Sequence, residues 1–246
     1  LAAAGYNRIP VTRDVPADLD TPLSVYLKLA RGPYSYLLES AQGGEKWGRY
    51  SIIGLPARTV LRVVRDRITV ERDGEIVEET RADDPLAFVA AFKARHQVPD
   101  LPDLPRFSGG LVGYFGYDTV RYVEPRLADS SPPDELGTPD ILLMVSDEVI
   151  VFDNLRGRMT LISHAALDEG DDLEQTQRHL EQLGEGLKAP IPEDVTRGRP
   201  LGNGPAIDET DFASGFGREA FMEAVERIRE YTKAGDVMQV VLSQRM

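Results

Sequence analysis

The sequence predicts an α+β fold, made mainly of antiparallel sheets with flanking helices. Asp73-Gly74 separates two short runs rich in β-branched residues, and this dipeptide is typical of a two-residue hairpin turn. Asn154-Leu155-Arg156-Gly157 lies between two further apolar runs and indicates a second hairpin. Helical segments lie between these strands, and strands joined in hairpins favour α+β over a doubly wound parallel sheet.

Local signals then predict the elements in order along the chain. Asp20-Thr21-Pro22 starts a helix, because a capping side chain precedes a proline at the first helical position, and Gly32 ends it. Asp84-Pro85 starts a second helix. Apolar residues at helical spacing predict two more, over residues 173–187 and from Phe221 to the glycine at 235. Strands are expected at residues 34–40, 49–55, 59–64, 67–70, 76–77, 111–117, 141–152 and 158–163.

The composition excludes several classes of protein. The chain has 246 residues, 41% of them hydrophobic, and no cysteine, which excludes a disulfide scaffold, a thiolate metal site and a cysteine nucleophile. With 28 basic and 41 acidic residues the net charge is −13, which argues against binding to nucleic acid or to an anionic membrane. No apolar run approaches the roughly 18 residues of a membrane span. We therefore expect a soluble, cytoplasmic protein.

The distribution of glycine and proline divides the chain into three parts. Nine glycine or proline residues lie between positions 184 and 205, which predicts a linker. We expect an N-terminal domain over residues 1–183, a linker over 184–214 and the start of another domain over 215–246. The chain begins without methionine and ends just after the apolar run 237–242, so we expect it to be a fragment.

Histidines and glycines offer no clear metal or phosphate site. His96, His164 and His179 are isolated in the sequence, without metal-ligand spacing, and are expected to be surface or capping residues. The glycines at 109, 110, 113 and 116 do not match a dinucleotide-binding or P-loop pattern. They predict close backbone packing within a sheet.

A candidate ligand site lies at Leu37-Leu38-Glu39-Ser40, at the end of an expected strand. An amino-acid ligand carries an ammonium that needs an acceptor and a carboxylate that needs a donor, which Glu39, Ser40 and the nearby Arg49 supply. Leu38 and Ser40 share one face of a regular strand and Glu39 lies on the other, unless the strand bulges or ends there. A strand that simply enters a polar turn is the alternative.

Gln239 interrupts the apolar run 237–242, which predicts a strand buried on both faces. A buried amide that lacks hydrogen-bond partners costs about 1–3 kcal/mol. Gln239 therefore either bonds a neighbouring strand for structural reasons or lines a polar active-site cavity.

Four segments taken together resemble anthranilate synthase component I, a family of chorismate-utilising enzymes. The family chain is much longer, and the similarity runs from about residue 11 to the end, so this chain resembles its N-terminal half. The segments are Leu37-Leu38-Glu39-Ser40, Trp47-Gly48-Arg49-Tyr50-Ser51-Ile52-Ile53-Gly54, Gly109-Gly110-Leu111-Val112-Gly113-Tyr114-Phe115-Gly116-Tyr117-Asp118 and the stretch 235–245.

The resemblance implies a lyase that converts chorismate and ammonia to anthranilate and pyruvate, with magnesium bound. It implies a glutamine amidotransferase subunit as partner and L-tryptophan as feedback inhibitor, bound by Leu38, Glu39, Ser40 and Arg49. The magnesium ligands are expected beyond residue 246, with none in this chain, and residues 215–246 would begin a truncated chorismate-binding catalytic domain. Related enzymes that use water carry lysine where Gln239 stands, so Gln239 is assigned to the nucleophile side of the chorismate pocket.

Two alternatives remain open at this point. Aminodeoxychorismate synthase component I also uses ammonia and is expected to carry glutamine at the same position. A non-catalytic module that binds an amino acid is the second. On either enzymatic interpretation, residues 1–246 alone are expected to be inactive.

Overall fold

The computed structural model describes the chain except residues 1, 42–46, 129, 131–132, 135 and 194–206. The chain divides into two compact units, residues 1–196 and 197–246, and the division falls within the predicted linker. The last helix of the first unit ends at Gly186, and Leu187 is buried in its core. The first unit therefore continues past residue 183.

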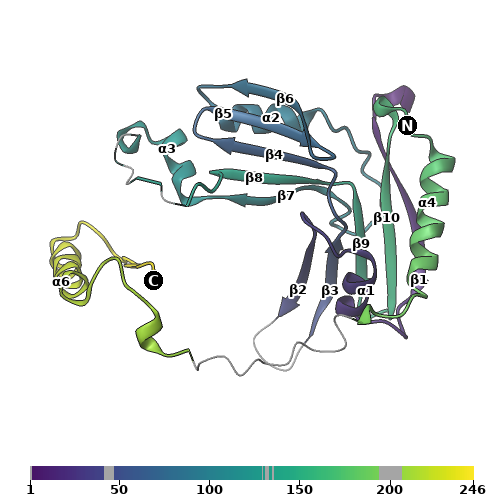
Figure 1. Cartoon of the computed structure of the whole chain (residues 1–246). Coiled ribbons are helices and arrows are strands. Elements are labelled where there is room, and N and C mark those ends of the chain that lie inside the picture. The colour runs from purple at the N-terminus through teal and green to yellow at the C-terminus, as the bar shows by residue number, and fades with distance from the viewer. Residues whose placement is uncertain (1, 42–46, 129, 131–132, 135, 194–206) are drawn as a thin grey trace. The chain divides into compact units, whose positions relative to one another are not determined.

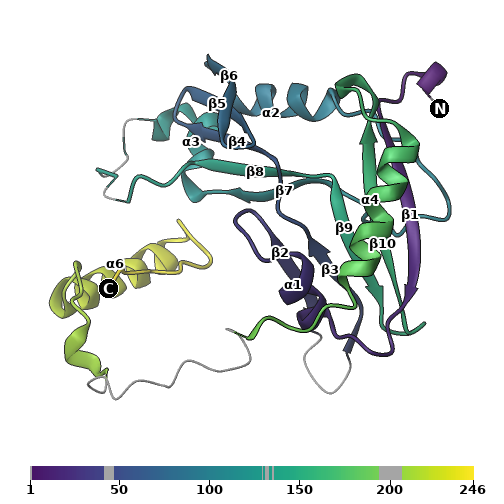
Figure 2. The ribbon, with the colours of Figure 1, turned by 45° about the vertical axis from the view of Figure 1, so that its right-hand side comes forward.

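Two antiparallel five-stranded sheets make up the first unit (Figures 1 and 2). One sheet has the order β1-β10-β9-β3-β2 and the other the order β6-β5-β4-β8-β7, which agrees with the α+β prediction. The strands of the first are β1 (Arg8–Pro16), β2 (Tyr36–Ala41), β3 (Trp47–Gly54), β9 (Glu148–Asp153) and β10 (Arg158–Ala166). Those of the second are β4 (Thr59–Val64), β5 (Arg67–Arg72), β6 (Glu75–Arg81), β7 (Gly110–Phe115) and β8 (Ile141–Ser146).

The apolar run 141–152 forms two strands instead of the single strand expected. β8 lies between β4 and β7 in one sheet, and β9 lies between β10 and β3 in the other. The run is broken at Asp147, whose carbonyl oxygen accepts the backbone N–H of His164 at 3.0 Å. Both halves are central strands and almost wholly buried. Ser146, Asp147 and Glu148 interrupt the apolar run at this point, but their polarity does not show that the two halves join different sheets.

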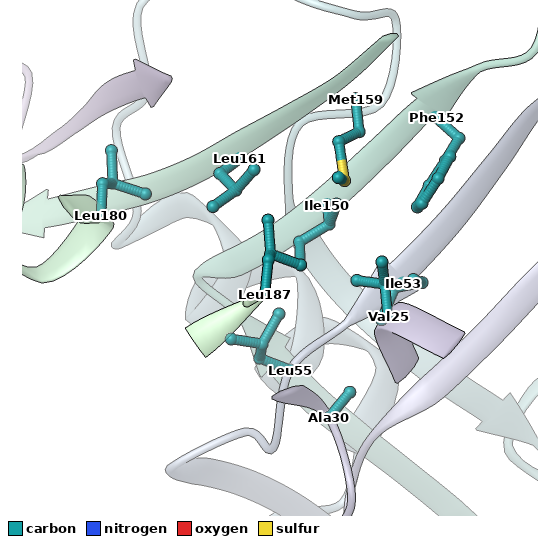
Figure 3. Close-up of a cluster of buried hydrophobic side chains, with 10 residues drawn as sticks. All are labelled: Val25, Ala30, Ile53, Leu55, Ile150, Phe152, Met159, Leu161, Leu180 and Leu187. Carbon is teal, nitrogen blue, oxygen red and sulfur yellow. The ribbon is translucent and has the colours of Figure 1, made fainter. Parts of the chain in front are cut away.

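Helices cover the sheets and complete two hydrophobic cores. α1 (Pro22–Leu29) and α4 (Leu173–Gly186) pack on the first sheet around a cluster that includes Val25, Leu161 and Leu180 (Figure 3). α2 (Pro85–Ala94) packs its buried residues on the second sheet. The expected caps are present: side chains of Thr21, Asp84 and Asp172 accept backbone N–H groups at the starts of α1, α2 and α4. The short helix α3 spans Val120–Val123.

The second unit contains the helix α6 (Arg218–Ala234), which ends at Gly235 with a φ of 82°, as the sequence predicts. None of the residues of α6 is buried. Residues 237–242 form no strand, so the predicted buried strand is wrong for this structure. A strand needs hydrogen-bonded neighbours, and residues 207–246 provide none. Across the part of the chain that is described, every helix is too short or too polar to cross a membrane.

Candidate functional site

The Leu-Leu-Glu-Ser motif lies on β2, an edge strand that pairs with β3 at the margin of the first sheet. Leu37 packs against the core, whereas Leu38 is 51% exposed and pairs with Ile52. Glu39 is exposed and lies opposite Ser51. The motif therefore presents an apolar and an acidic side chain to the surroundings from one short segment.

A register shift interrupts the β2–β3 ladder directly after Glu39. Glu39 pairs with Ser51 and the next pair is Ala41 with Trp47, so Ser40 alone on β2 lies opposite three residues of β3, 48–50. A bulge adds unpaired residues to one strand and breaks the strict alternation of side chains along that strand. Here the extra residues belong to β3, so the alternation is broken around Arg49, whereas β2 keeps a regular register up to Glu39. The side chain of Ser40 lies outside the described residues.

Arg49 on β3 is held in place by Asp153 at the end of β9. Its Nε and Nη2 donate to the two carboxylate oxygens of Asp153, at 3.2 and 2.9 Å. The guanidinium also lies 4.8 Å from the ring centroid of Tyr50. The hydrogen bond from Arg49 holds the pKa of Asp153 below its usual range, and the same bond raises the pKa of Arg49. Arg49 is thereby kept charged and oriented.

Part of the Arg49 guanidinium remains available to a ligand. The side chain is 44% exposed, and the hydrogen bonds to Asp153 use Nε and Nη2 only. A guanidinium has five N–H donors, so Nη1 can still donate to a carboxylate. β2 and β3 therefore offer an acceptor for an ammonium group at Glu39 and a donor for a carboxylate at Arg49.

Asp153 is the residue that the sequence analysis missed. It also accepts the backbone N–H groups of Leu155 and Arg156, at 3.2 and 3.3 Å, and so closes the turn between β9 and β10. Its partner Arg49 is 104 residues away. The aspartate before Asn154 is a turn signal in the sequence, but that signal does not identify the distant arginine.

The glycine-rich segment fills the role predicted for it. A Cβ added to Gly113 would lie 1.9 Å from the carbonyl oxygen of Leu142 on β8, and one added to Gly109 would lie 2.6 Å from the carbonyl of Ser146. The backbones of β7 and β8 approach each other where any side chain would collide. This confirms close packing as the role of Gly109 and Gly113, whereas nothing lies within 4 Å of a Cβ added at Gly110.

The histidines lie apart from the motif. His96 Nδ1 contacts the carbonyl of Phe92 at 3.2 Å, and His179 Nε2 lies 2.6 Å from Glu148. His164 is buried on β10, where it pairs with Pro10 of β1, so the expectation of a surface or capping residue is wrong for it. The described residues include no group of three or more histidines, aspartates or glutamates that could hold a metal ion.

Gln239 lies in the second unit, in the irregular and exposed stretch that follows α6. It is therefore not the buried amide that the apolar run predicted. The Leu-Leu-Glu-Ser motif on β2 belongs to the first unit and Gln239 to the second, so the structure describes the two separately.

Comparison with known proteins gives consistent matches over the whole chain. Residues 33–246 match the family model described as chorismate binding enzyme. The chain is 58% identical over 246 residues to anthranilate synthase component 1 of Pseudomonas putida and 48% identical to that of Neisseria meningitidis serogroup B, covering 100% of this chain and 49% of each relative. The crystal structure of anthranilate synthase component I from Streptococcus pneumoniae matches with a TM-score of 0.60 and 27% identity, over 94% of this chain and 47% of that one. The chain thus spans about half the length of the curated relatives that it matches.

Proposed function

Because the chain belongs to the family of chorismate binding enzymes, we propose that it forms the N-terminal half of an anthranilate synthase component I. The complete enzyme would convert chorismate and ammonia to anthranilate and pyruvate, with a glutamine amidotransferase subunit supplying the ammonia. One observation carries this proposal: relatives that bear this name are up to 58% identical to the chain along its entire length.

The β2–β3 hairpin would bind the feedback inhibitor L-tryptophan. Glu39 is exposed and would accept the ammonium group, while Arg49, oriented by Asp153, would donate to the carboxylate. The exposed side chain of Leu38 offers an apolar contact for the indole ring. Ser40 follows Glu39 on β2 and faces the bulged segment of β3 that carries Arg49, so we include Ser40 in the same site.

Gln239 would orient the nucleophile in the chorismate pocket. An amide cannot take a proton from water, but it can hydrogen-bond to ammonia, which is a nucleophile in its neutral form. The exposed position of Gln239 leaves its amide free to meet groups outside this chain.

The described residues include no group of three or more metal-ligating side chains. We assign the magnesium ligands to the part of the enzyme outside this sequence.

The test is to identify the product formed by the full-length protein. Incubated with chorismate, magnesium and an ammonium salt, it should produce anthranilate, detected by its fluorescence and separated by chromatography. Omission of the ammonium salt is the control. Aminodeoxychorismate as the main product would show that the protein is an aminodeoxychorismate synthase component I instead. A protein that binds L-tryptophan but converts no chorismate would be a regulatory module.

A further inference from the structure

A polar cavity lies in the first unit, away from the Leu-Leu-Glu-Ser motif. It has a volume of about 500 Å³, within the range of roughly 300–1,000 Å³ that is usual for small-molecule sites. Its walls come from the connection between β3 and β4, the junction of β8 and β9, the end of β10 and the first turns of α4. Leu38, Glu39 and Arg49 do not line it. The cavity therefore does not belong to the proposed tryptophan site.

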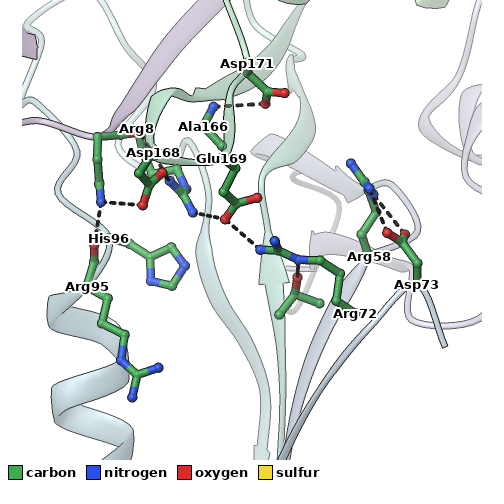
Figure 4. A network of polar contacts seen from close by, with 12 residues as sticks. Arg8, Arg58, Arg72, Asp73, Arg95, His96, Ala166, Asp168, Glu169 and Asp171 are labelled. Carbon is green, nitrogen blue, oxygen red and sulfur yellow. Dashed lines mark hydrogen bonds and ion pairs between the residues drawn. The ribbon is translucent and has the colours of Figure 1, made fainter. Parts of the chain in front are cut away.

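The arginines that line this cavity already have anionic partners. Figure 4 shows two of these pairs beside the loop that follows β10. An anionic ligand would have to compete with carboxylates that are already in contact, so these arginines are poor receptors for it. The pairs are Arg58 with Asp73 at 2.7 Å, Arg72 with Glu169 at 2.6 Å, and Arg178 with Glu174 at 2.7 Å.

Asp147 differs from these residues because its carboxylate has no partner. It lines the cavity at the junction of β8 and β9, and its side chain forms no ion pair or hydrogen bond with any residue that the structure describes. Burial raises the pKa of this carboxyl group above its ordinary value. The neighbouring cation Arg8 is already paired with Asp168 and Glu169. Asp147 is thus a half-buried anion without a counter-ion of its own.

His164 places a hydrogen-bond acceptor in the same wall. The residue is 7% exposed, and its Nδ1 lies 2.9 Å from the carbonyl oxygen of Asp147. A carbonyl can only accept, so Nδ1 carries the proton, and in the neutral imidazole Nε2 has a lone pair that can accept a hydrogen bond. Nε2 has no hydrogen-bond partner among the described residues, and it is not sealed from the cavity that His164 lines. Asp147 and His164 both line this cavity.

We propose that this cavity binds a small molecule with a protonated primary amine, which donates hydrogen bonds to the Asp147 carboxylate and to His164 Nε2. An ammonium group has three N–H donors and a positive charge, which match one unpaired anion and one neutral acceptor. Neither the Asp147 carboxylate nor His164 Nε2 has a hydrogen-bond partner in the described part of the chain, whereas the arginines that line the cavity are paired with carboxylates. The ligand class follows from this contrast.

Three probes with the same carbon chain test the proposal: butylammonium, butan-1-ol and butyrate. The chain has three histidines, so its imidazole signals can be followed by NMR, and His96→Gln and His179→Gln identify the signal of His164 by elimination. Butylammonium should shift the His164 signal to saturation, and the other two probes at the same concentration should not. Asp147→Asn should weaken butylammonium binding by about tenfold or more, because it removes a charged hydrogen bond.

Glu75→Gln is the matched control, since it makes the same chemical change on an exposed residue outside the cavity and should leave the affinity unchanged. Equal binding of butylammonium by the Asp147→Asn variant would overturn the proposal, and so would a saturable response to butyrate or butan-1-ol alone. Circular dichroism checks that Asp147→Asn folds. If it does not, the comparison of the three probes on the unaltered chain decides the question.

Discussion

Replacing Gly113 by alanine should destabilise the first unit at the contact between β7 and β8. The added Cβ would lie 1.9 Å from the carbonyl oxygen of Leu142, whereas non-bonded heavy atoms pack at about 3.5 Å or more. The backbones would have to separate by roughly 1.5 Å, and the obstacle is a backbone atom of a central strand, which cannot rotate away. Overpacking costs about 1–3 kcal/mol, and we expect the upper end of this range.

Urea denaturation of the chain measures this effect through the midpoint and the slope of the transition. Gly184→Ala is the control of opposite sign. Gly184 lies inside α4, and an added Cβ would lie 3.3 Å from Cζ of Arg13, the far end of a mobile side chain. Alanine at this helical position should stabilise the unit by about 0.5–1 kcal/mol. An unfolding free energy for Gly113→Ala within about 0.5 kcal/mol of the unaltered chain would refute close packing as the role of Gly113.

Three further predictions concern the proposed sites and one charged pair. In the full-length enzyme, Ser40→Phe should leave the uninhibited rate within a few-fold and raise the tryptophan concentration for half-inhibition about tenfold or more; joint loss of rate and inhibition would make Ser40 structural. Gln239→Lys should lower ammonia-dependent turnover about tenfold or more, and unchanged turnover in a variant with a normal melting temperature would remove Gln239 from the active site. Glu148 raises the pKa of His179 by a hydrogen bond, so this pair stabilises the fold fully below the ordinary histidine pKa of about 6.5 and loses its effect as the pH rises through the raised value. His179→Gln should therefore lower the urea midpoint more at pH 6 than at pH 9, and an equal loss at both would contradict this assignment.

Features that depend on a few consecutive residues were predictable from the sequence. The turn at Asp73-Gly74 has φ angles of 52° and 86°, which are the left-handed values that the Asp-Gly pair indicates. Thr21 and Asp84 cap their helices as expected, and β4 spans Thr59–Val64 as predicted. At the turn and at the two helix caps the partner atoms lie within a few residues along the chain.

Features that depend on distant partners were not predictable. The polar residues Ser146, Asp147 and Glu148 mark a break in the run 141–152, but the assignment of β8 and β9 to different sheets depends on the neighbouring strands. The Leu-Leu-Glu-Ser motif could be located on a strand, but the ion pair that orients Arg49 spans 104 residues. Residues 237–242 have the composition of a strand and lack the neighbours that would make them one.

The passage of the chain from β8 directly into β9 has a consequence for how the first unit unfolds. Each of these strands lies between two other strands of its own sheet. Because β8 continues directly into β9, separation of β8 from one sheet also disturbs β9 in the other sheet. Amide protons on β8 and β9 should therefore exchange with solvent only in the same global opening, with one common free energy. We therefore expect the two sheets to unfold as a single cooperative unit. Edge strands such as β2 and β6 can open separately, so their amide protons should exchange independently of this unit.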